Sequence, residues 1–118
     1  MQITQREVRG VIILDLEGRL VIEDGVPSFV ERMNALSHRD GTRILLNFDK
    51  VTYLDSAGVR MLYELGKRLT LRSQSLVVVS PSGRPPRRVL ELTGLPERVR
   101  VVETLAEANE AVTATKNA

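Results

Sequence analysis

The segment ILLNFDKVTYLDSAGVRMLYELGKRL, residues 44–69, decides the fold because it joins a short buried strand to an amphipathic helix. Ile44, Leu46 and Phe48 alternate along the strand, and the residues between them are apolar enough for burial on both faces. The stretch DKVTYLD, residues 49–55, is predicted to be a loop. The helix after it is predicted to bury a wide face, made of Ala57, Val59, Met61, Leu62, Leu65, Gly66 and Leu69.

Strands and helices alternate on both sides of this unit. Residues 2–18 read as one or two strands that turn near Arg9-Gly10, with Ile12, Leu14 and Leu16 on one side. The next helix is predicted to start with Asp24 as its cap and Pro27 at its first position, and Phe29, Met33 and Leu36 follow at helical spacing. Further along, the patterns predict a strand at 75–80, a helix at 85–93 stopped by Gly94 and a strand at 98–102. A last helix is predicted to start at Thr104, which has capping-box spacing to Glu107. The order predicts an α/β fold, a small mostly parallel mixed sheet with an N-terminal β-hairpin and about four helices packed on it.

Length and composition indicate one folded domain over residues 1–118. Hydrophobic residues make up 42% and charged residues 27% of the 118 residues, a mixture typical of globular proteins. The chain has no cysteine, so disulfides and thiolate metal sites are excluded. Its first apolar run is too short for a signal peptide or a spanning helix, so we expect a cytoplasmic protein without membrane insertion. A formal charge of +2 gives no indication of nucleic-acid binding.

No catalytic constellation is evident, so we expect a protein that is not an enzyme and needs no cofactor. Neither a dinucleotide-binding glycine motif nor a P-loop occurs. His38 is the one histidine, which excludes a histidine-rich metal site and leaves a surface residue near a helix end as the simpler interpretation. Carboxylates such as Asp49, Asp55 and Glu64 have no spacing that singles out an acid/base pair.

Ser56 raises a question of its own, because it stands at the start of the helix in residues 44–69. Serine and aspartate are favoured N-cap residues, and from the residues alone a plain cap is the favoured interpretation. A phosphate on Ser56 would also be accepted by the positive end of the helix, and its charge would disturb an apolar partner. Gly58 and Ala57 are small and would leave room beside the hydroxyl for another protein.

The chain resembles the STAS domain family, in particular the bacterial anti-sigma factor antagonists of the SpoIIAA or RsbV kind. ILLNFDKVTYLDSAGVRMLYEL is similar to the family's strand, loop and D-S-[SA]-G-[LV] helix start, and RRVLELTGLPERVRVVETLAEA is similar to its closing stretch with L-x-x-[ST]-G-L. The resemblance covers nearly the whole chain. It implies the same small mixed sheet with packed helices.

The resemblance implies that Ser56 is a phosphoacceptor in partner switching. The unphosphorylated chain would bind an anti-sigma factor, a serine kinase of the histidine-kinase-like ATPase class, and so release a sigma factor. Phosphorylation of Ser56 would end the binding, and a metal-dependent serine phosphatase would restore it. By the same resemblance Asp55 positions Ser56, and the partner contact is lined by Ala57, Gly58, Val59 and Arg60.

One segment departs from the family pattern. Where the family commonly reads G-[ED]-[LI]-D-x-x-[TN], this chain reads GRLVIEDGVPSF, with Val21 or Ile22 near the usual aspartate. Either the helix start has shifted and Asp24 takes the polar role, or the partner differs from the usual kinase. STAS domains also resemble components of lipid transport systems and of stress-sensing assemblies. The resemblance thus leaves a second function open, a constitutive STAS interaction subunit of a transport or stress-sensing assembly in which Ser56 is not phosphorylated.

Overall fold

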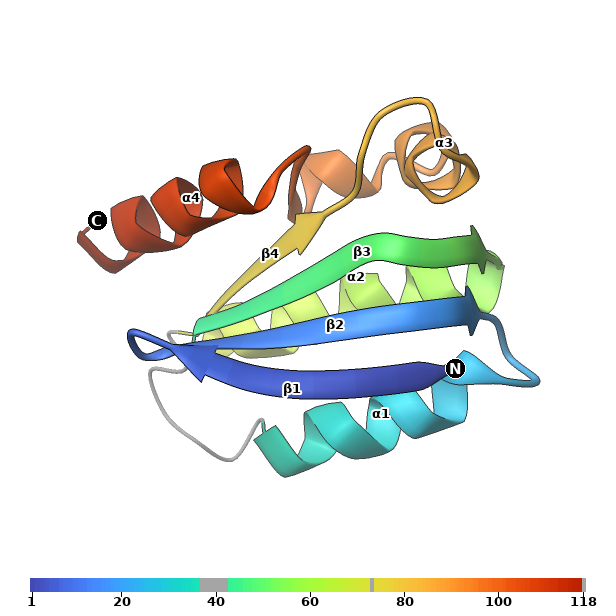
Figure 1. The fold of residues 1–118 in the computed structure, drawn as a ribbon, viewed down its shortest axis with the longest axis horizontal. Helices are drawn as coiled ribbons and strands as arrows, with labels where there is room; N and C mark the ends of the chain where they lie inside the picture. Colours follow the sequence, from blue (N-terminus) through green and yellow to red (C-terminus); the bar gives the residue numbers. More distant parts are fainter. Residues whose placement is uncertain (37–42, 73, 118) are drawn as a thin grey trace.

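The computed structural model describes the backbone of residues 1–36, 43–72 and 74–117, a five-stranded mixed sheet with helices on both faces (Figure 1). Its elements are β1 (Gln2–Val8), β2 (Val11–Leu20), α1 (Gly25–Leu36), β3 (Arg43–Leu54), α2 (Ser56–Leu71), β4 (Ser75–Val79), α3 (Pro85–Leu92), the 3-10 helix η1 (Leu95–Glu97), β5 (Arg100–Val102) and α4 (Leu105–Asn117). The strands lie in chain order. β1 is antiparallel to β2, and the other neighbouring pairs are parallel. The predicted α/β fold with its N-terminal hairpin is confirmed.

The hairpin turns at the predicted place. Val8 pairs with Val11, and the two residues between them, Arg9 and Gly10, have φ angles of 52° and 79°. Two positive φ angles in a two-residue loop match the right-handed twist of the strands that the loop joins. The resulting register turns alternate β2 residues towards the helices of one face.

The prediction of a loop at residues 49–55 is wrong for all but the last residue, because β3 continues to Leu54. Between the pairs Asp15–Asn47 and Glu17–Lys50, β3 has one residue more than β2, and a second shift follows at Gly18. Each extra residue is a β-bulge, which interrupts the two-residue alternation. The buried positions of β3 therefore occur at every third residue after Phe48, a spacing that sequence reasoning did not recognise as a strand.

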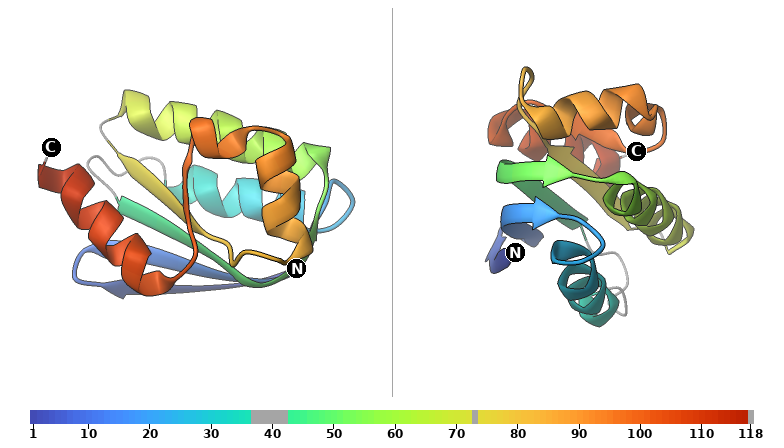
Figure 2. Two further views of the ribbon diagram at one scale, coloured as in Figure 1. Left: turned by 90° about the horizontal axis from the view of Figure 1, so that it is seen from above. Right: turned by 90° about the vertical axis from the view of Figure 1, so that its right-hand side faces the viewer.

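The sheet separates two apolar cores. α1 and α2 lie side by side on one face and α4 lies on the other (Figure 2). The larger core joins fully buried residues of the strands, such as Leu14 and Leu46, to Phe29 of α1 and Leu62 of α2. The smaller core packs the other face of β3, β4 and β5 against α4. Both faces of the central strands are therefore buried, as expected for a parallel sheet.

α1 buries Phe29 and Met33 as the helical spacing predicted, but it starts at Gly25, so Pro27 is its third residue and not its first. A Cβ on Gly25 would lie 2.5 Å from the backbone oxygen of Arg19, which explains why a glycine begins this helix. The expected surface position of His38 lies outside the described residues.

The C-terminal elements follow their predicted signals. α3 begins at Pro85 and is followed by Gly94 with φ 74°, a conformation that favours glycine and ends the helix. The backbone N–H of Glu107 donates to the hydroxyl of Thr104 at 3.2 Å, which confirms the predicted cap of α4. In the described part of the chain, no helix is long and apolar enough to cross a lipid bilayer.

Candidate functional site

Ser56 is the first residue of α2, and its side chain is exposed. The residue before it, Asp55, is the N-cap: its carboxylate accepts from the backbone N–H of Gly58 at 2.9 Å. The interpretation of Ser56 as the cap is therefore wrong, because the aspartate one residue earlier already satisfies the free amide. The Ser56 hydroxyl is left on the surface without a capping role.

The Asp55 carboxylate also ties two parts of the chain together. Its second oxygen accepts from the backbone N–H of Ile22 at 3.1 Å, and Ile22 lies in the connection between β2 and α1. The backbone N–H of Asp55 in turn donates to the carbonyl of Leu20 at 3.4 Å. One side chain thus fixes the β2–α1 connection against the start of α2, which holds Ser56 in a defined place.

Gly58 lies on the buried side of α2 and does not line the space beside Ser56. A Cβ at this position would lie 2.5 Å from Cδ1 of Leu54 and 2.7 Å from the backbone oxygen of Leu20. The expectation that Gly58 leaves room for a partner is corrected: its missing side chain lets α2 approach the ends of β2 and β3. Ala57 and Val59 are half-buried, and Arg60 is exposed.

Two grooves meet at Ser56, one on each side of α2. The groove towards α1, called here the α1-side groove, has Ser56 at one end. Its apolar lining residues are Ile22, Val26, Val30, Ala57 and Met61. Ile22 is 62% exposed, although it is a large hydrophobic residue. The surface next to Ser56 therefore offers apolar contact area to a partner.

The second groove, called here the η1-side groove, runs between α2 and the turn that contains η1. It is lined by Ser56, Val59, Tyr63 and, from the facing turn, Leu95 and Arg98 among others. The guanidinium carbon of Arg98 lies 5.9 Å from the centre of the Tyr63 ring, a cation–π contact. Arg60 lines both grooves.

Several residues of these grooves were missed by sequence reasoning. The TGL motif, residues 93–95, was recognised, but nothing in its pattern indicated that it would face the α2 residues Val59 and Tyr63. Ile22 was noticed as a departure from the family pattern, and its exposure gives that departure a structural meaning. The exposed apolar residue itself was the available signal.

Asp24 lines neither groove, although Ile22 and Val26, which flank it in the chain, line the groove towards α1. Its carboxylate accepts from the backbone amine of Met1 at 2.8 Å, and its side chain is 46% exposed. It precedes Gly25, the first residue of α1. The structure therefore brings Asp55, Ala57, Val59 and Arg60 together with Ser56, whereas the Asp24 carboxylate is engaged by Met1 and lines neither groove.

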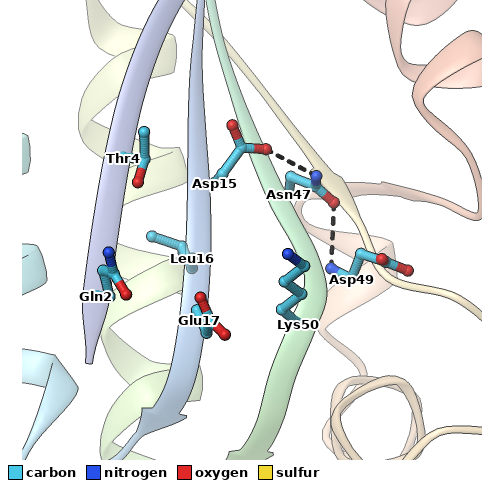
Figure 3. Close-up of a pocket in the computed structure, with 8 residues that line it drawn as sticks. All are labelled: Gln2, Thr4, Asp15, Leu16, Glu17, Asn47, Asp49 and Lys50. Carbon is cyan, nitrogen blue, oxygen red and sulfur yellow. Dashed lines mark hydrogen bonds between the residues drawn. The ribbon is translucent and has the colours of Figure 1, made fainter.

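A second polar cluster lies on the sheet face that α4 leaves open, in a pocket between β1, β2 and β3 (Figure 3). Asp15 is its centre: the carboxylate accepts from Nε of Arg6 at 2.8 Å and from the amide of Asn47 at 2.8 Å. These donors, with Arg6 the larger cause, lower the pKa of Asp15 below its usual range.

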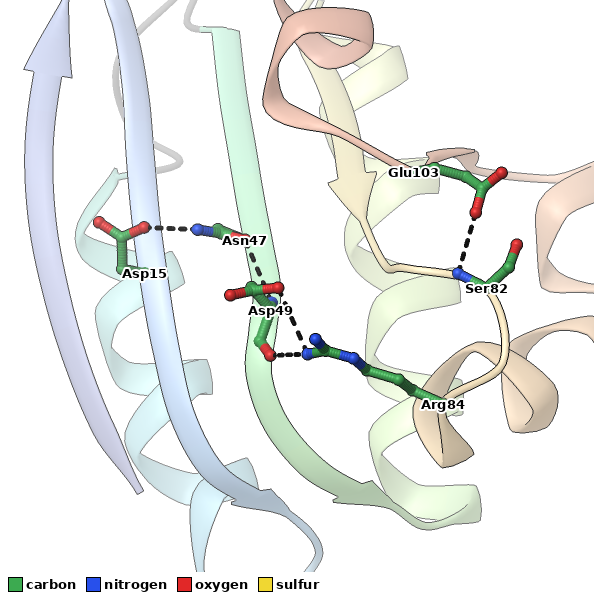
Figure 4. Close-up of polar contacts among 6 residues, drawn as sticks. All are labelled: Asp15, Asn47, Asp49, Ser82, Arg84 and Glu103. Carbon is green, nitrogen blue, oxygen red and sulfur yellow. Dashed lines mark hydrogen bonds and ion pairs between the residues drawn. The ribbon is translucent and has the colours of Figure 1, made fainter.

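The same cluster continues to the turn before α3 (Figure 4). The side-chain oxygen of Asn47 accepts from the backbone N–H of Asp49 at 3.1 Å, and Arg84 donates to both the backbone and the carboxylate of Asp49. Nearby, Glu103 accepts from the N–H of Ser82 at 3.0 Å, and hydrogen bonding by Ser82, first through its side chain and then through its backbone, lowers the pKa of the Glu103 carboxyl. These polar groups form hydrogen bonds with one another. Among the described residues, no cluster of three or more His, Cys, Asp or Glu side chains is placed to hold a metal ion.

The sequence and the fold were compared with protein families and with solved structures. The sequence profile of the STAS domain matches residues 2–108, while no curated protein sequence matches the chain. A solved anti-sigma factor antagonist from Mycobacterium paratuberculosis superposes with a TM-score of 0.80 at 21% identity, covering 95% of this chain and 93% of that one. A Thermotoga maritima protein, described as a candidate anti-sigma factor antagonist, gives 0.76 at 27% identity, covering 94% of each chain.

The phosphorylated form of SpoIIAA from Bacillus, a cell fate determinant, is a further structural neighbour. Its TM-score is 0.65 at 19% identity, covering 94% of this chain and 99% of that one. At such identity the likeness concerns the fold: a five-stranded mixed sheet with four α-helices. Because the family profile spans most of the sequence and the fold agrees with it, this chain belongs to the STAS domain family.

Proposed function

We propose that this chain is an anti-sigma factor antagonist that works by partner switching, with Ser56 as the phosphoacceptor. The observation that carries the proposal is the division of roles between two neighbours: Asp55 caps α2, while Ser56 is exposed where two grooves meet. A hydroxyl with no part in the cap can be modified without unfolding the helix. The family membership and the neighbours named as anti-sigma factor antagonists support the same role.

In the proposed cycle, the unphosphorylated chain binds an anti-sigma factor kinase of the histidine-kinase-like ATPase class and releases its sigma factor. The kinase transfers the γ-phosphoryl group of ATP to Oγ of Ser56; the hydroxyl proton leaves with a base of the kinase, and ADP is released. A metal-dependent serine phosphatase then hydrolyses the ester, giving back the hydroxyl and inorganic phosphate. ATP and metal therefore belong to the partners.

The expected effect of the phosphate follows from the surface that surrounds it. A phosphoserine brings about −1.5 to −2 charges, and Ile22, Val26 and Met61 form an apolar lining beside it. A partner seated on these side chains would have to bury the phosphate, and removing such a charge from water costs free energy even when a cation of this chain pairs with it. Phosphorylation is thus expected to end the complex while leaving the fold intact. In this scheme Ala57, Val59 and Arg60 contact the partner.

The alternative, a constitutive STAS interaction subunit, is favoured by one observation. Ile22 is 62% exposed next to Ser56, at the segment where the family pattern commonly has a polar residue. Permanent interfaces are more hydrophobic than transient ones, so an apolar residue where the family pattern has a polar one suits a permanent contact. Under this alternative Ser56 would be a plain contact residue.

A binding experiment separates the two functions. The chain is made with either serine or phosphoserine at position 56, and each form is titrated by calorimetry with the anti-sigma factor kinase of its own host. We expect the phosphoserine form to lose at least tenfold in affinity. Equal affinity of the two forms would favour the constitutive subunit, and Ile22→Asp, expected to weaken both forms, checks that the α1-side groove is the contact.

A further inference from the structure

We propose that Arg60 binds the phosphate of phosphorylated Ser56 and gives up its ion pair with Glu64 when it does so. The proposal rests on the proposed function in one respect, because it takes Ser56 as the phosphoacceptor. It adds a residue with two states: Arg60 is paired with Glu64 when Ser56 carries a hydroxyl, and with the phosphate when Ser56 is modified.

The position of Arg60 carries the first step. Arg60 follows Ser56 by four residues in α2, so the two side chains are neighbours one turn apart on the same side of the helix. Both grooves that border Ser56 are also lined by Arg60. Its side chain is 81% exposed, so it is free to change its partner without disturbing the core.

The present partner of Arg60 is a weak competitor. Nε of Arg60 lies 3.3 Å from Oε1 of Glu64, whose side chain is 64% exposed. Ion pairs of this exposed kind contribute little to stability, since water and salt screen them. A phosphate has more charge than a carboxylate and offers three acceptor oxygens to the planar guanidinium fork. The exchange from Glu64 to the phosphate is therefore favourable.

A phosphate on Ser56 would lie beside the Asp55 carboxylate at the start of α2, and a nearby cation would stabilise it there. Asp55, directly before Ser56, already occupies the N–H groups of Gly58 and Ile22 with its two oxygens, at 2.9 and 3.1 Å. That carboxylate takes up part of the positive end of the helix and repels a second anion beside it. A nearby guanidinium offsets this repulsion.

The other charged residues of the two grooves leave Arg60 as the best placed cation. The charged side chains that line them are Arg60 and Glu64 on α2, and Glu97 and Arg98 at the facing turn. Arg98 lines the η1-side groove only, and its guanidinium lies over the ring of Tyr63, seven residues after Ser56. Glu97 is next to it in the chain.

The exchange would change the surface that a partner meets. Before modification, a partner carboxylate can approach the exposed guanidinium of Arg60. After modification, Arg60 is neutralised by the phosphate, and the Glu64 carboxylate, which lines the α1-side groove, is left without this pair. One phosphoryl group would thus remove a positive contact and add negative charge beside Ile22.

The test uses the whole chain with phosphoserine installed at position 56 during translation, so that neither kinase nor partner is needed. The pKa of the phosphate is measured by ³¹P NMR in the otherwise unchanged protein and in Arg60→Gln, Glu64→Gln and Arg98→Gln. We expect Arg60→Gln to raise the midpoint by roughly half a pH unit, because a nearby cation favours the dianion even when it is exposed. Glu64→Gln should leave the midpoint unchanged or lower it, and Arg98→Gln should leave it unchanged.

Two outcomes would overturn the proposal: a midpoint in Arg60→Gln equal to that of the unchanged protein, or a larger rise in Arg98→Gln than in Arg60→Gln. A second readout is the Nε–H signal of Arg60, which should move with the same midpoint as the phosphate. Because the phosphate is installed without a kinase, the titration stands even if no host kinase modifies Ser56. Conversely, modification of Ser56 in the host with no effect of Arg60→Gln would leave the switch intact and remove Arg60 from it.

Discussion

At the scale of single residues, Asp55 and Ser56 have different tasks although either could cap a helix. The Asp55 carboxylate accepts from Gly58 and Ile22, while Ser56 is exposed. The sequence could not separate the two, because adjacent aspartate and serine both favour the N-cap position. Only the direction of the Asp55 side chain decides which residue is the cap.

This division predicts a difference in stability between two alanine variants. Ser56→Ala should change the free energy of unfolding by less than about 0.5 kcal/mol, because its side chain is exposed and does not cap the helix. Asp55→Ala should cost about 1 to 2 kcal/mol, because it removes the cap and the bond to Ile22. Urea denaturation measures both, and Asp55→Asn, which keeps an acceptor, serves as the control. Equal losses for the two alanine variants would contradict the assignment.

Gly58 gives a second prediction at this scale. Gly58→Ala should destabilise the protein by about 1 to 3 kcal/mol, because the new Cβ would meet the Leu20 backbone oxygen and Leu54 Cδ1 at less than 3 Å. Gly66→Ala in the same helix is the matched control, since its nearest atom is a side-chain methyl of Val99. We expect a smaller loss there, and thermal denaturation compares the two. A Gly58→Ala variant as stable as Gly66→Ala would show that α2 can move away from the strand ends.

At the scale of secondary structure, the spacing of apolar residues, every second residue in strands and every third or fourth in helices, was sufficient to predict most elements. Ile12, Leu14 and Leu16 predicted the inner face of β2, and Phe29 and Met33 predicted the buried side of α1. The second half of β3 could not be predicted in this way. Its two bulges replace the alternation by a spacing of three residues, and they arise from pairing with β2, which is information outside the segment itself.

The strand pair β1–β2 makes a prediction about pH. The pKa of Asp15 is lowered mainly by its bond to Arg6, so its ionised form stabilises the folded state. That contribution is present above the ordinary aspartate pKa of about 4 and is lost as the pH falls through the lower folded value. Asp15→Asn should remove it, with a loss of at most about 1 kcal/mol at neutral pH because the pair is partly exposed and screened.

The measurement is urea denaturation between pH 2 and 7. The difference in stability between the unchanged protein and Asp15→Asn should shrink as the pH falls below 4. Gln2→Asn, a change between neutral side chains in the same pocket, is the control and should leave the profile unchanged. A difference that is constant across this range would mean that the Asp15 charge has no part in it.

At the scale of the whole molecule, the fold was predictable and the site was predictable only in part. Alternating patterns and the two family motifs led to the mixed sheet, and the D-S-A-G stretch led to Ser56. The two grooves beside Ser56 could not be foreseen, because they form only when α1 and η1 pack on either side of α2. Asp24 was one of two options for the polar role in the family pattern, but its carboxylate accepts from the amine of Met1 and lines neither groove.

The grooves and the exposed hydroxyl lead to one claim about the molecule, that a kinase of its host modifies Ser56. The most direct test is intact-mass and peptide mass spectrometry of the chain after incubation with ATP and a lysate of its own host, with Ser56→Ala as control. We predict one added phosphate, located on Ser56 and absent from the Ser56→Ala control. An unmodified Ser56, in a lysate where the chain is shown to bind its anti-sigma factor, would contradict the switch.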